Sequence, residues 1–233
     1  DPKVSYQELR RHFAAGTLSH QLEIKLKDFV IQLDKPFAVR SSSSSEDSLT
    51  QPFAGVFDTY IIPNDEMNKR AVLENVALAI KLVFASVYSD KARTYFKAIH
   101  HKIEDEKMAV VLQELVGSRH DDYFYPHISG VAQSYNYYPV AHMKPEEGFA
   151  VAAVGLGSYV VDGWKSYRFS PVYPNIQMLS VKDMLNSSQV KFFALDCSSN
   201  NFDILEDGEH ASLKLLDISE AEKYGVLTHC ASV

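Results

Sequence analysis

Apolar residues recur at helical spacing in two stretches near the start of the chain, Val4 to Ala14 and Ser19 to Leu33. This pattern predicts two amphipathic helices, the second with Ser19 as its N-cap. A longer stretch, Asp65 to about Tyr88, repeats the pattern as a continuous apolar stripe. We expect this long helix to bury one face against a sheet. A further helix is expected from Lys91 to about His101.

Shorter apolar runs bounded by turn-forming residues predict strands. They are residues 36–39, 56–62, 108–116, 128–134, 148–154 and 191–196. The run 108–116 is apolar almost throughout, which is typical of a strand covered on both faces. A last short helix is expected from Ser219 to Tyr224, and Leu205 to Glu209 is typical of a solvated turn.

Composition narrows the class of protein. The 233 residues are 46% apolar, which is enough for a sizeable core in one domain of two lobes or in two small domains. The formal net charge of −7 disfavours nonspecific binding to nucleic acid, because such proteins usually present a basic face. We therefore expect no nucleic-acid partner, although a local basic pocket is compatible with this charge.

The cysteines and the apolar segments indicate in which cellular compartment the protein is expected. Cys197 and Cys230 lie far apart without C-x-x-C spacing, so neither a disulfide framework nor a zinc site is indicated. The most apolar stretch, Gly148 to Val161, is interrupted by glycines and is shorter than the roughly 20 residues of a membrane-spanning helix. We expect a cytoplasmic protein without a membrane partner and without a signal peptide. Because the first residue is Asp1, we also expect a piece of a longer protein.

The candidate chemistry lies between the first two predicted strands. Arg40 follows the first strand, the serines Ser41 to Ser45 come next, and Gly55 opens a second turn. A serine run alone is typical of a flexible loop, but here strands bracket it on both sides. A guanidinium can make paired charge-assisted hydrogen bonds to phosphate, and a glycine allows backbone to approach a ligand closely. The stretch therefore predicts a phosphate-binding loop that includes Arg40, Ser41, Ser42 and Gly55.

These residues resemble the nucleotide-binding domain of phosphoenolpyruvate synthase and pyruvate phosphate dikinase. The family pattern reads roughly V-R-S-S-A-T-A-E-D, a short spacer, then F-A-G-Q-x-D/E-T. The chain matches it at Arg40, Ser41, Ser42, Glu46, Asp47, Phe53, Ala54, Gly55, Asp58 and Thr59. The resemblance implies that Arg40 is the catalytic residue that stabilises phosphate charge and that Thr59 lines the pocket. The family's glutamine after the glycine is Val56 here.

Three later segments also resemble the family. Residues 108–116 are similar to its V-V-V-Q-x-M-V strand, after whose glutamine the backbone binds adenine. Those positions are Gln113, Glu114, Leu115 and Val116, and a plain buried strand with a polar exit is the alternative. Residues 128–134 are similar to S-G-V-x-F-T, and residues 155–163 to G-L-G-E-A-V-V-S-G with Ser158 at the glutamate position. From Trp164 onward the resemblance thins.

The resemblance implies an α+β fold, an ATP-grasp-like nucleotide-binding domain with a mixed sheet flanked by helices. Residues 1–34 would be its helical lead-in, 35–163 its core, and 164–233 a C-terminal extension that the pattern does not assign. The family's metal-binding E-x-E and Q-S-R-P strands are not found in the chain, which we expect to be truncated before them. The implied cofactors are ATP and Mg²⁺, with the metal ligands outside this chain and no metal-binding residue assigned within it.

The implied parent protein is a phosphotransferase that moves phosphate from ATP to a histidine on a separate domain and then to pyruvate. Its partners would be ATP and the phosphohistidine and pyruvate-binding domains of the same full-length protein. The piece alone is expected to be inactive. Two alternatives stay open. One is a dikinase or phosphotransferase with another acceptor, a glucan or a small molecule such as rifampin, and the other is a non-catalytic nucleotide-sensing module.

Overall fold

The computed structural model describes residues 4–43, 55–100, 102–140, 143–161, 163–174, 180–198 and 202–230. By its contacts the chain divides into two units. Unit 1 comprises Asp1–Leu115 with Asp196–Leu213, and unit 2 comprises Val116–Leu195 with Lys214–Val233. The expected division at residues 34 and 163 stays a prediction about sequence segments, whereas these units divide the chain at other points.

The predicted helices of unit 1 are confirmed, and polar side chains cap their first turns. They are α1 (Tyr6–Ala15), α2 (His20–Gln32), α3 (Lys69–Ser86), which follows the 3-10 turn η1 (Glu66–Asn68), and α4 (Asp90–Ala98). Ser5 and Glu8 form a reciprocal capping box at α1, and the Ser19 hydroxyl accepts from the Leu22 N–H at α2. Ser89 caps α4 in the same way. These caps satisfy N–H groups that the helices themselves leave unpaired.

The strands of unit 1 form an antiparallel sheet in the order β2-β1-β3. They are β1 (Phe37–Ser43), β2 (Thr59–Ile62) and β3 (Met108–Glu114). The expectation that the first strand ends at Arg40 and gives way to a serine turn is wrong, because β3 pairs with β1 as far as Ser43, which lies opposite Met108. β2 begins at Thr59, later than the apolar pattern predicted.

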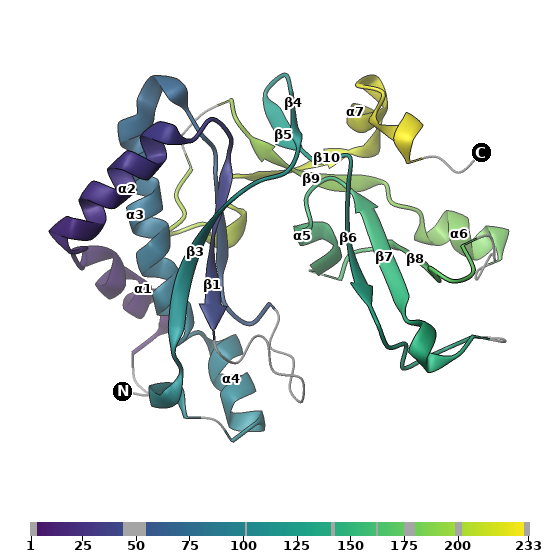
Figure 1. The fold of residues 1–233 in the computed structure, drawn as a ribbon, viewed down its shortest axis with the longest axis horizontal. Helices are drawn as coiled ribbons and strands as arrows, with labels where there is room; N and C mark the ends of the chain where they lie inside the picture. Colours follow the sequence, from purple (N-terminus) through teal and green to yellow (C-terminus); the bar gives the residue numbers. More distant parts are fainter. Residues whose placement is uncertain are drawn as a thin grey trace. The chain divides into compact units, whose positions relative to one another are not determined.

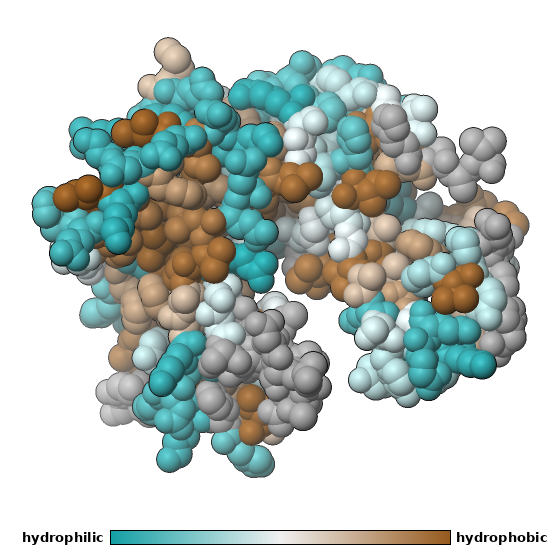
Figure 2. Space-filling model, viewed as in Figure 1, coloured by the Kyte–Doolittle hydropathy of each residue, from teal (hydrophilic) through white to brown (hydrophobic). Residues whose placement is uncertain are grey.

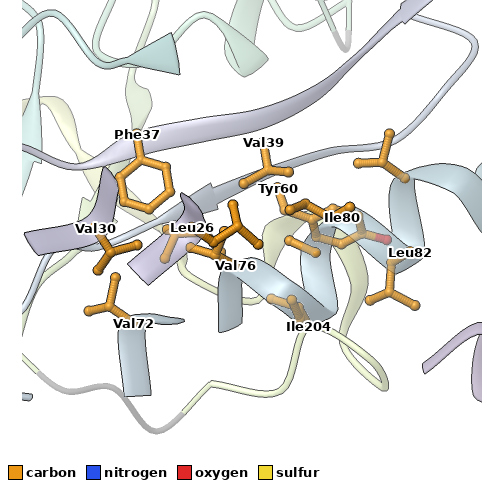
Figure 3. Packing of buried hydrophobic residues seen from close by; sticks show 13 residues of the cluster. Leu26, Val30, Phe37, Val39, Tyr60, Val72, Val76, Ile80, Leu82 and Ile204 are labelled. Atoms are coloured by element: carbon orange, nitrogen blue, oxygen red, sulfur yellow. The ribbon is translucent and has the colours of Figure 1, made fainter. Parts of the chain in front are cut away.

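The core of unit 1 lies between this sheet and helices α2 and α3 (Figures 1 and 3). Phe37, Val39 and Tyr60 are fully buried there, and burial of one such side chain stabilises the fold by about 1.5–3 kcal/mol. In Figure 2, brown apolar atoms gather in unit 1 between its helices and its strands. The expectation that β3 is covered on both faces is wrong. Its burial alternates, and Val111 is 39% exposed.

The apolar character of α3 follows from this position. Among the described residues, one segment, Glu66–Ala98, is long and apolar enough by composition to cross a membrane. Half of its most apolar window is buried inside the protein. Val72, Val76 and Val83 face the core, so burial against the sheet accounts for the sequence of this helix.

A late segment of the chain returns to unit 1 and covers the outer edge of β2. The Glu209 carboxylate accepts a hydrogen bond from the Thr59 N–H at 2.6 Å, and the Ser212 hydroxyl donates to the Ile61 carbonyl at 2.6 Å. Glu209 lies in the 3-10 turn η4 (Gly208–His210). Because exposed strand edges invite pairing with other chains, these contacts protect the edge of the sheet.

Unit 2 consists mainly of short strands, described here by itself. Its elements are β4 (Ser118–His120), β5 (Tyr123–Tyr125), β6 (Ile128–Gln133), β7 (Phe149–Val154), α5 (Ser158–Val161), β8 (Tyr167–Phe169), α6 (Val181–Ser187), β9 (Lys191–Asp196), β10 (Leu213–Asp217) and α7 (Ile218–Lys223). The strands form two sheets, ordered β10-β9-β5-β4 and β6-β7-β8. β9 and β10 reach the boundary, since Asp196 and Leu213 belong to unit 1.

The predicted strands 128–134, 148–154 and 191–196 are confirmed as β6, β7 and β9. β4, β5, β8, α6 and β10 were not predicted. The α+β class is confirmed, but the described strands form three sheets instead of one, and the pairs with a described register are antiparallel. Short strands joined by tight turns favour this arrangement.

Candidate functional site

The register of β1 with its neighbours gives the sheet of unit 1 two different faces. Directly opposed residues of an antiparallel pair place their side chains on the same face. Phe37, Val39, Ser41, Ser43, Tyr60, Ile62, Met108, Val110 and Leu112 form the face that packs toward the helices, here called the helix face. Ala38, Arg40, Ser42, Thr59, Ile61, Ala109, Val111 and Gln113 form the opposite one, the outer face.

Arg40 is the cation of the outer face. It lies opposite Thr59 on β2 and Val111 on β3, and it is exposed. Within the described part of the chain, its guanidinium makes no ion pair or side-chain hydrogen bond. The five N–H donors of a guanidinium form a rigid fork that suits phosphate oxygens. Among the described residues nothing compensates this positive charge, which suits a phosphate ligand.

The two predicted serines lie on different faces. Ser42 is exposed on the outer face, on the same side as Arg40. Ser41 is 5% exposed on the helix face, and Ser43 on that face donates a hydrogen bond to Glu106. Because alternate residues of a strand point to opposite faces, Ser41 and Ser42 cannot both offer their hydroxyls to one ligand on the outer face.

The predicted site residues of the outer face are spread along the pair of strands β1 and β3. Ser42 lies opposite Ala109, and Ala38 lies opposite Gln113. These positions are four residues apart on β1, which corresponds to about 13 Å at about 3.3 Å per residue. Gly55, which precedes β2 in the sequence, adopts a left-handed conformation with φ 76°. Ser42 and Gln113 thus lie toward opposite ends of one strand pair, with Arg40 between them.

The predicted adenine-binding residues follow the end of β3. Gln113 is exposed on the outer face, and Glu114 forms an exposed ion pair with Lys35 at 2.9 Å. The Leu115 N–H donates to the Pro36 carbonyl at 2.9 Å. Val116 is 83% exposed, and its backbone makes no hydrogen bond among the described residues. The chain passes from unit 1 to unit 2 between Leu115 and Val116.

Val56, which stands at the position of the family's glutamine, is buried. It is 7% exposed and packs with Phe57 in a small apolar cluster that includes Phe96 from α4. The polar contact that a glutamine offers is therefore replaced here by apolar packing. Glu46, Asp47, Phe53 and Ala54 lie outside the described residues.

The side chain of Asp58, which matches the family motif, is engaged by other side chains of unit 1. Its carboxylate accepts hydrogen bonds from Tyr6 at 3.0 Å and Tyr60 at 2.8 Å, and it lies 3.6 Å from Arg10. Burial, and then the Asp58 charge, raise the pKa of both tyrosines well above the usual range. Arg10 also donates to the Ile204 carbonyl at 2.5 Å. Asp58 therefore joins α1 to β2, and Arg10 extends this network to the returning segment of unit 1.

Sequence reasoning missed Arg10, which is only 5% exposed. An arginine in an amphipathic helix is normally solvated, so its position in the pattern gave no signal. Its neighbour Arg11 forms an exposed pair with Glu206 at 3.1 Å. The two arginines together fix the returning segment to α1.

The segment at the start of α5, in unit 2, has a glycine that its turn requires. Gly155 has φ 86°, and a Cβ there would lie 2.6 Å from a ring carbon of Phe192. The Ser129 hydroxyl donates to the Gly155 carbonyl at 2.5 Å, which joins β6 to this turn. Ser158 begins α5. Among the described residues, no group of three His, Cys, Asp or Glu side chains could hold a metal ion.

Comparison with known proteins decides which family this fold represents. Residues 3–224 match the family described as "Pyruvate phosphate dikinase, AMP/ATP-binding domain". The chain belongs to this family. It is an ATP-binding domain of the phosphotransferase type with an ATP-grasp-type fold. The match continues through residues 164–224, which the motif comparison left unassigned.

Individual relatives agree with the family. The chain is 33% identical over 152 residues to "Uncharacterized phosphotransferase YvkC" of Bacillus subtilis, a match that covers 64% of the chain and 16% of the relative. It is 30% identical over 196 residues to a phosphoenolpyruvate synthase of Aeropyrum pernix, which covers 81% of the chain and 22% of the relative. It is 32% identical over 129 residues to a rifampicin phosphotransferase of Streptomyces sviceus, which covers 54% and 13%. The matches span about a fifth or less of these relatives.

Proposed function

We propose that the chain is the ATP-binding domain of a phosphoenolpyruvate synthase-like phosphotransferase. The observation that carries the proposal is the arrangement of the outer face. It sets Arg40, Thr59 and Gln113 on one side of a single sheet, with the Gly55 turn toward one end and residues 113–116 at the other. The family is described as an AMP/ATP-binding domain, which makes ATP the expected ligand, and this face carries groups suited to it.

In the proposed complex the nucleotide lies along β1 and β3. Its phosphates contact Arg40, the Ser42 hydroxyl and the backbone near Gly55, while its purine contacts the backbone of residues 113–116. The N–H and C=O of Val116 have no hydrogen-bond partner among the described residues, and such groups suit the edge of a purine ring. Ser41 is buried, so we assign it to holding β1 in place and Thr59 to the wall of the site.

Arg40 acts by electrostatics and positioning, which supply most of the catalysis in phosphoryl transfer. As phosphoryl transfer proceeds, a phosphorus–oxygen bond of the nucleotide breaks and the leaving oxygen takes its electron pair. A histidine nitrogen on a separate domain forms the new bond to phosphorus. In the second step a base of the pyruvate-binding domain would take a methyl proton from pyruvate, and the enolate oxygen so formed accepts the phosphoryl group. The phosphorus–nitrogen bond breaks, and its electron pair returns to the histidine nitrogen.

Mg²⁺ belongs to the same proposal, with protein ligands outside this chain. Bound to the nucleotide, it would neutralise charge on the phosphate oxygens. The phosphohistidine and pyruvate-binding domains are the proposed partners, and the cytoplasm the proposed location. Because the accepting groups belong to those domains, we propose that this chain alone binds ATP without turning it over.

A small-molecule acceptor is a second candidate. The rifampicin phosphotransferase of Streptomyces sviceus is 32% identical to this chain, about as similar as the synthases. The two candidates share the nucleotide site and differ only in the acceptor. Incubating the full-length protein with ATP and either pyruvate or rifampicin distinguishes them by the compound that gains phosphate.

Calorimetric titration with ATP and Mg²⁺ tests the nucleotide site. Arg40→Ala should weaken ATP binding about 10- to 100-fold, because a charge-assisted hydrogen bond contributes roughly 1.5–3 kcal/mol. Arg70→Ala is the matched control, since Arg70 is an exposed arginine of unit 1 that pairs with Glu74 on its own helix. Equal affinity for ATP in wild type and Arg40→Ala would remove Arg40 from the site.

A further inference from the structure

Unit 2 contains a pocket that the proposed nucleotide site does not use. It has a volume of about 530 Å³ and lies on one face of the β6-β7-β8 sheet. Val131, Val151 and Arg168 are directly opposed on the three strands, so their side chains share this face. Pockets of roughly 300–1,000 Å³ suit small organic molecules. Every described residue that lines it belongs to unit 2.

The charge of the pocket is positive. Lys165 and Arg168 line it, and no carboxylate is among its described lining residues. Neither cation forms an ion pair with a described residue, because Lys165 donates to the Asn186 carbonyl and Arg168 to the Asn136 amide oxygen. In a chain with a formal charge of −7, two cations without an ionic partner among the described residues favour an anion in this pocket.

Arg168 is held in place before any ligand arrives. Its guanidinium carbon lies 3.7 Å from the centre of the Phe149 ring, and it donates to Asn136 at 2.9 Å. Asn136 is itself 1% exposed, and its side-chain oxygen also accepts from the Tyr138 N–H. A fixed guanidinium loses little conformational entropy on binding, and its remaining N–H donors are suited to oxyanions.

The rest of the pocket is apolar and aromatic. Trp164 is 42% exposed at its wall, and its ring is fixed by Tyr159 at 5.4 Å and Phe193 at 5.8 Å. Val151 and Val160 add aliphatic surface. An inorganic anion would contact only the two cations and leave this apolar surface exposed to water. An anion with an attached organic group would also bury the apolar surface and would therefore bind more tightly.

We propose that this pocket binds an organic phosphate monoester, with its phosphate at Lys165 and Arg168 and its organic group against Trp164. Two cations suit a phosphate dianion better than a singly charged carboxylate. Phenyl phosphate is the simplest molecule with both parts. Benzoate has the ring with a single charge, and inorganic phosphate has the charge without the ring.

Trp164 is the one tryptophan of the chain, so its fluorescence reports on this pocket. Titration with phenyl phosphate should change the emission, with an affinity higher than that for benzoate or inorganic phosphate. Arg168→Gln should weaken phenyl phosphate about tenfold or more, and Arg168→Lys less, because lysine keeps the charge but loses the fork. Lys182→Gln, an exposed residue of α6 outside the pocket lining, is the matched control and should bind as wild type does.

Thermal unfolding of each variant checks that it is folded, and calorimetry with phenyl phosphate gives a second measure of affinity. An unchanged Trp164 emission and no heat of binding would overturn the proposal, as would equal affinity in wild type and Arg168→Gln. Arg40→Ala should keep its phenyl phosphate response. Loss of the response in that variant would assign the ligand to the nucleotide site and overturn the proposal. Failure of ATP binding at Arg40 leaves this pocket untouched, so the two proposals fail separately.

Discussion

The helix face and the outer face of the β2-β1-β3 sheet are made by alternate residues of the same strands, yet they serve different ends. On the helix face, Val39 and Tyr60 are fully buried, and the Tyr60 hydroxyl donates to Asp58, which is paired with Arg10. On the outer face, Arg40 has an exposed guanidinium without an ionic partner among the described residues. Neighbouring residues of one sequence motif therefore have different roles: some stabilise the fold, and others face the proposed ligand.

Removing the buried carboxylate should have the largest effect on stability. Asp58→Ala should lower the free energy of unfolding by about 3–5 kcal/mol, because Arg10 would be left buried without its counter-charge. Urea unfolding measures this change. Arg11→Ala is the control and should have little effect, since its pair with Glu206 is exposed. Similar losses in the two variants would contradict the structural role of Asp58.

A smaller loss is expected where one helix-face side chain is shortened. Val39→Ala should lower the free energy of unfolding by about 2–3 kcal/mol, from lost burial and the cavity left behind. The Kd for ATP, measured by calorimetry under conditions where the variant is folded, should not change. A weaker Kd would show that the helix face also shapes the nucleotide site.

The adjacent serines should differ most subtly. Ser42→Ala should weaken ATP about 2- to 10-fold, the worth of a neutral hydrogen bond of roughly 0.5–1.5 kcal/mol, and leave stability unchanged. Ser41→Ala should leave the Kd for ATP unchanged and lower the free energy of unfolding by about 1 kcal/mol, because that hydroxyl is buried. Calorimetry measures the Kd for ATP of both variants, and urea unfolding measures their free energies of unfolding. Weaker ATP binding in Ser41→Ala together with lower stability in Ser42→Ala would contradict the assignment of these serines to the two faces.

Elements with a long, regular pattern could be predicted from the sequence. The period of α3 and the serine caps of α1, α2 and α4 are local signals, so the ends of these helices were predicted to within four residues. The short strands β4 and β8 hold three residues each, too few to show a period. The return of residues 202–213 to β2 is a long-range contact that no local pattern encodes.

The sequence predicted which residues belong to the candidate site but not how they are arranged in space. Arg40, Thr59 and Gln113 were named from a motif, and pairing brings them to one face. The sequence could not show that Ser41 faces the helices, because the strand was expected to end at Arg40. Once β1 is extended to Ser43, the alternation of a strand decides that position. Asp58 lies just before β2, and its contacts with Tyr6, Tyr60 and Arg10 place it instead.

Replacing Val111 tests most directly whether the outer face binds the nucleotide. Val111 is 39% exposed and lies opposite Arg40, so Val111→Glu places a carboxylate beside the guanidinium. Val111→Gln is the neutral control of nearly the same shape. In calorimetric titration, Val111→Glu should bind ATP at least about tenfold more weakly than wild type, because the added charge repels phosphate and neutralises Arg40, whereas Val111→Gln should bind within about twofold. Wild-type affinity in both variants would contradict the account.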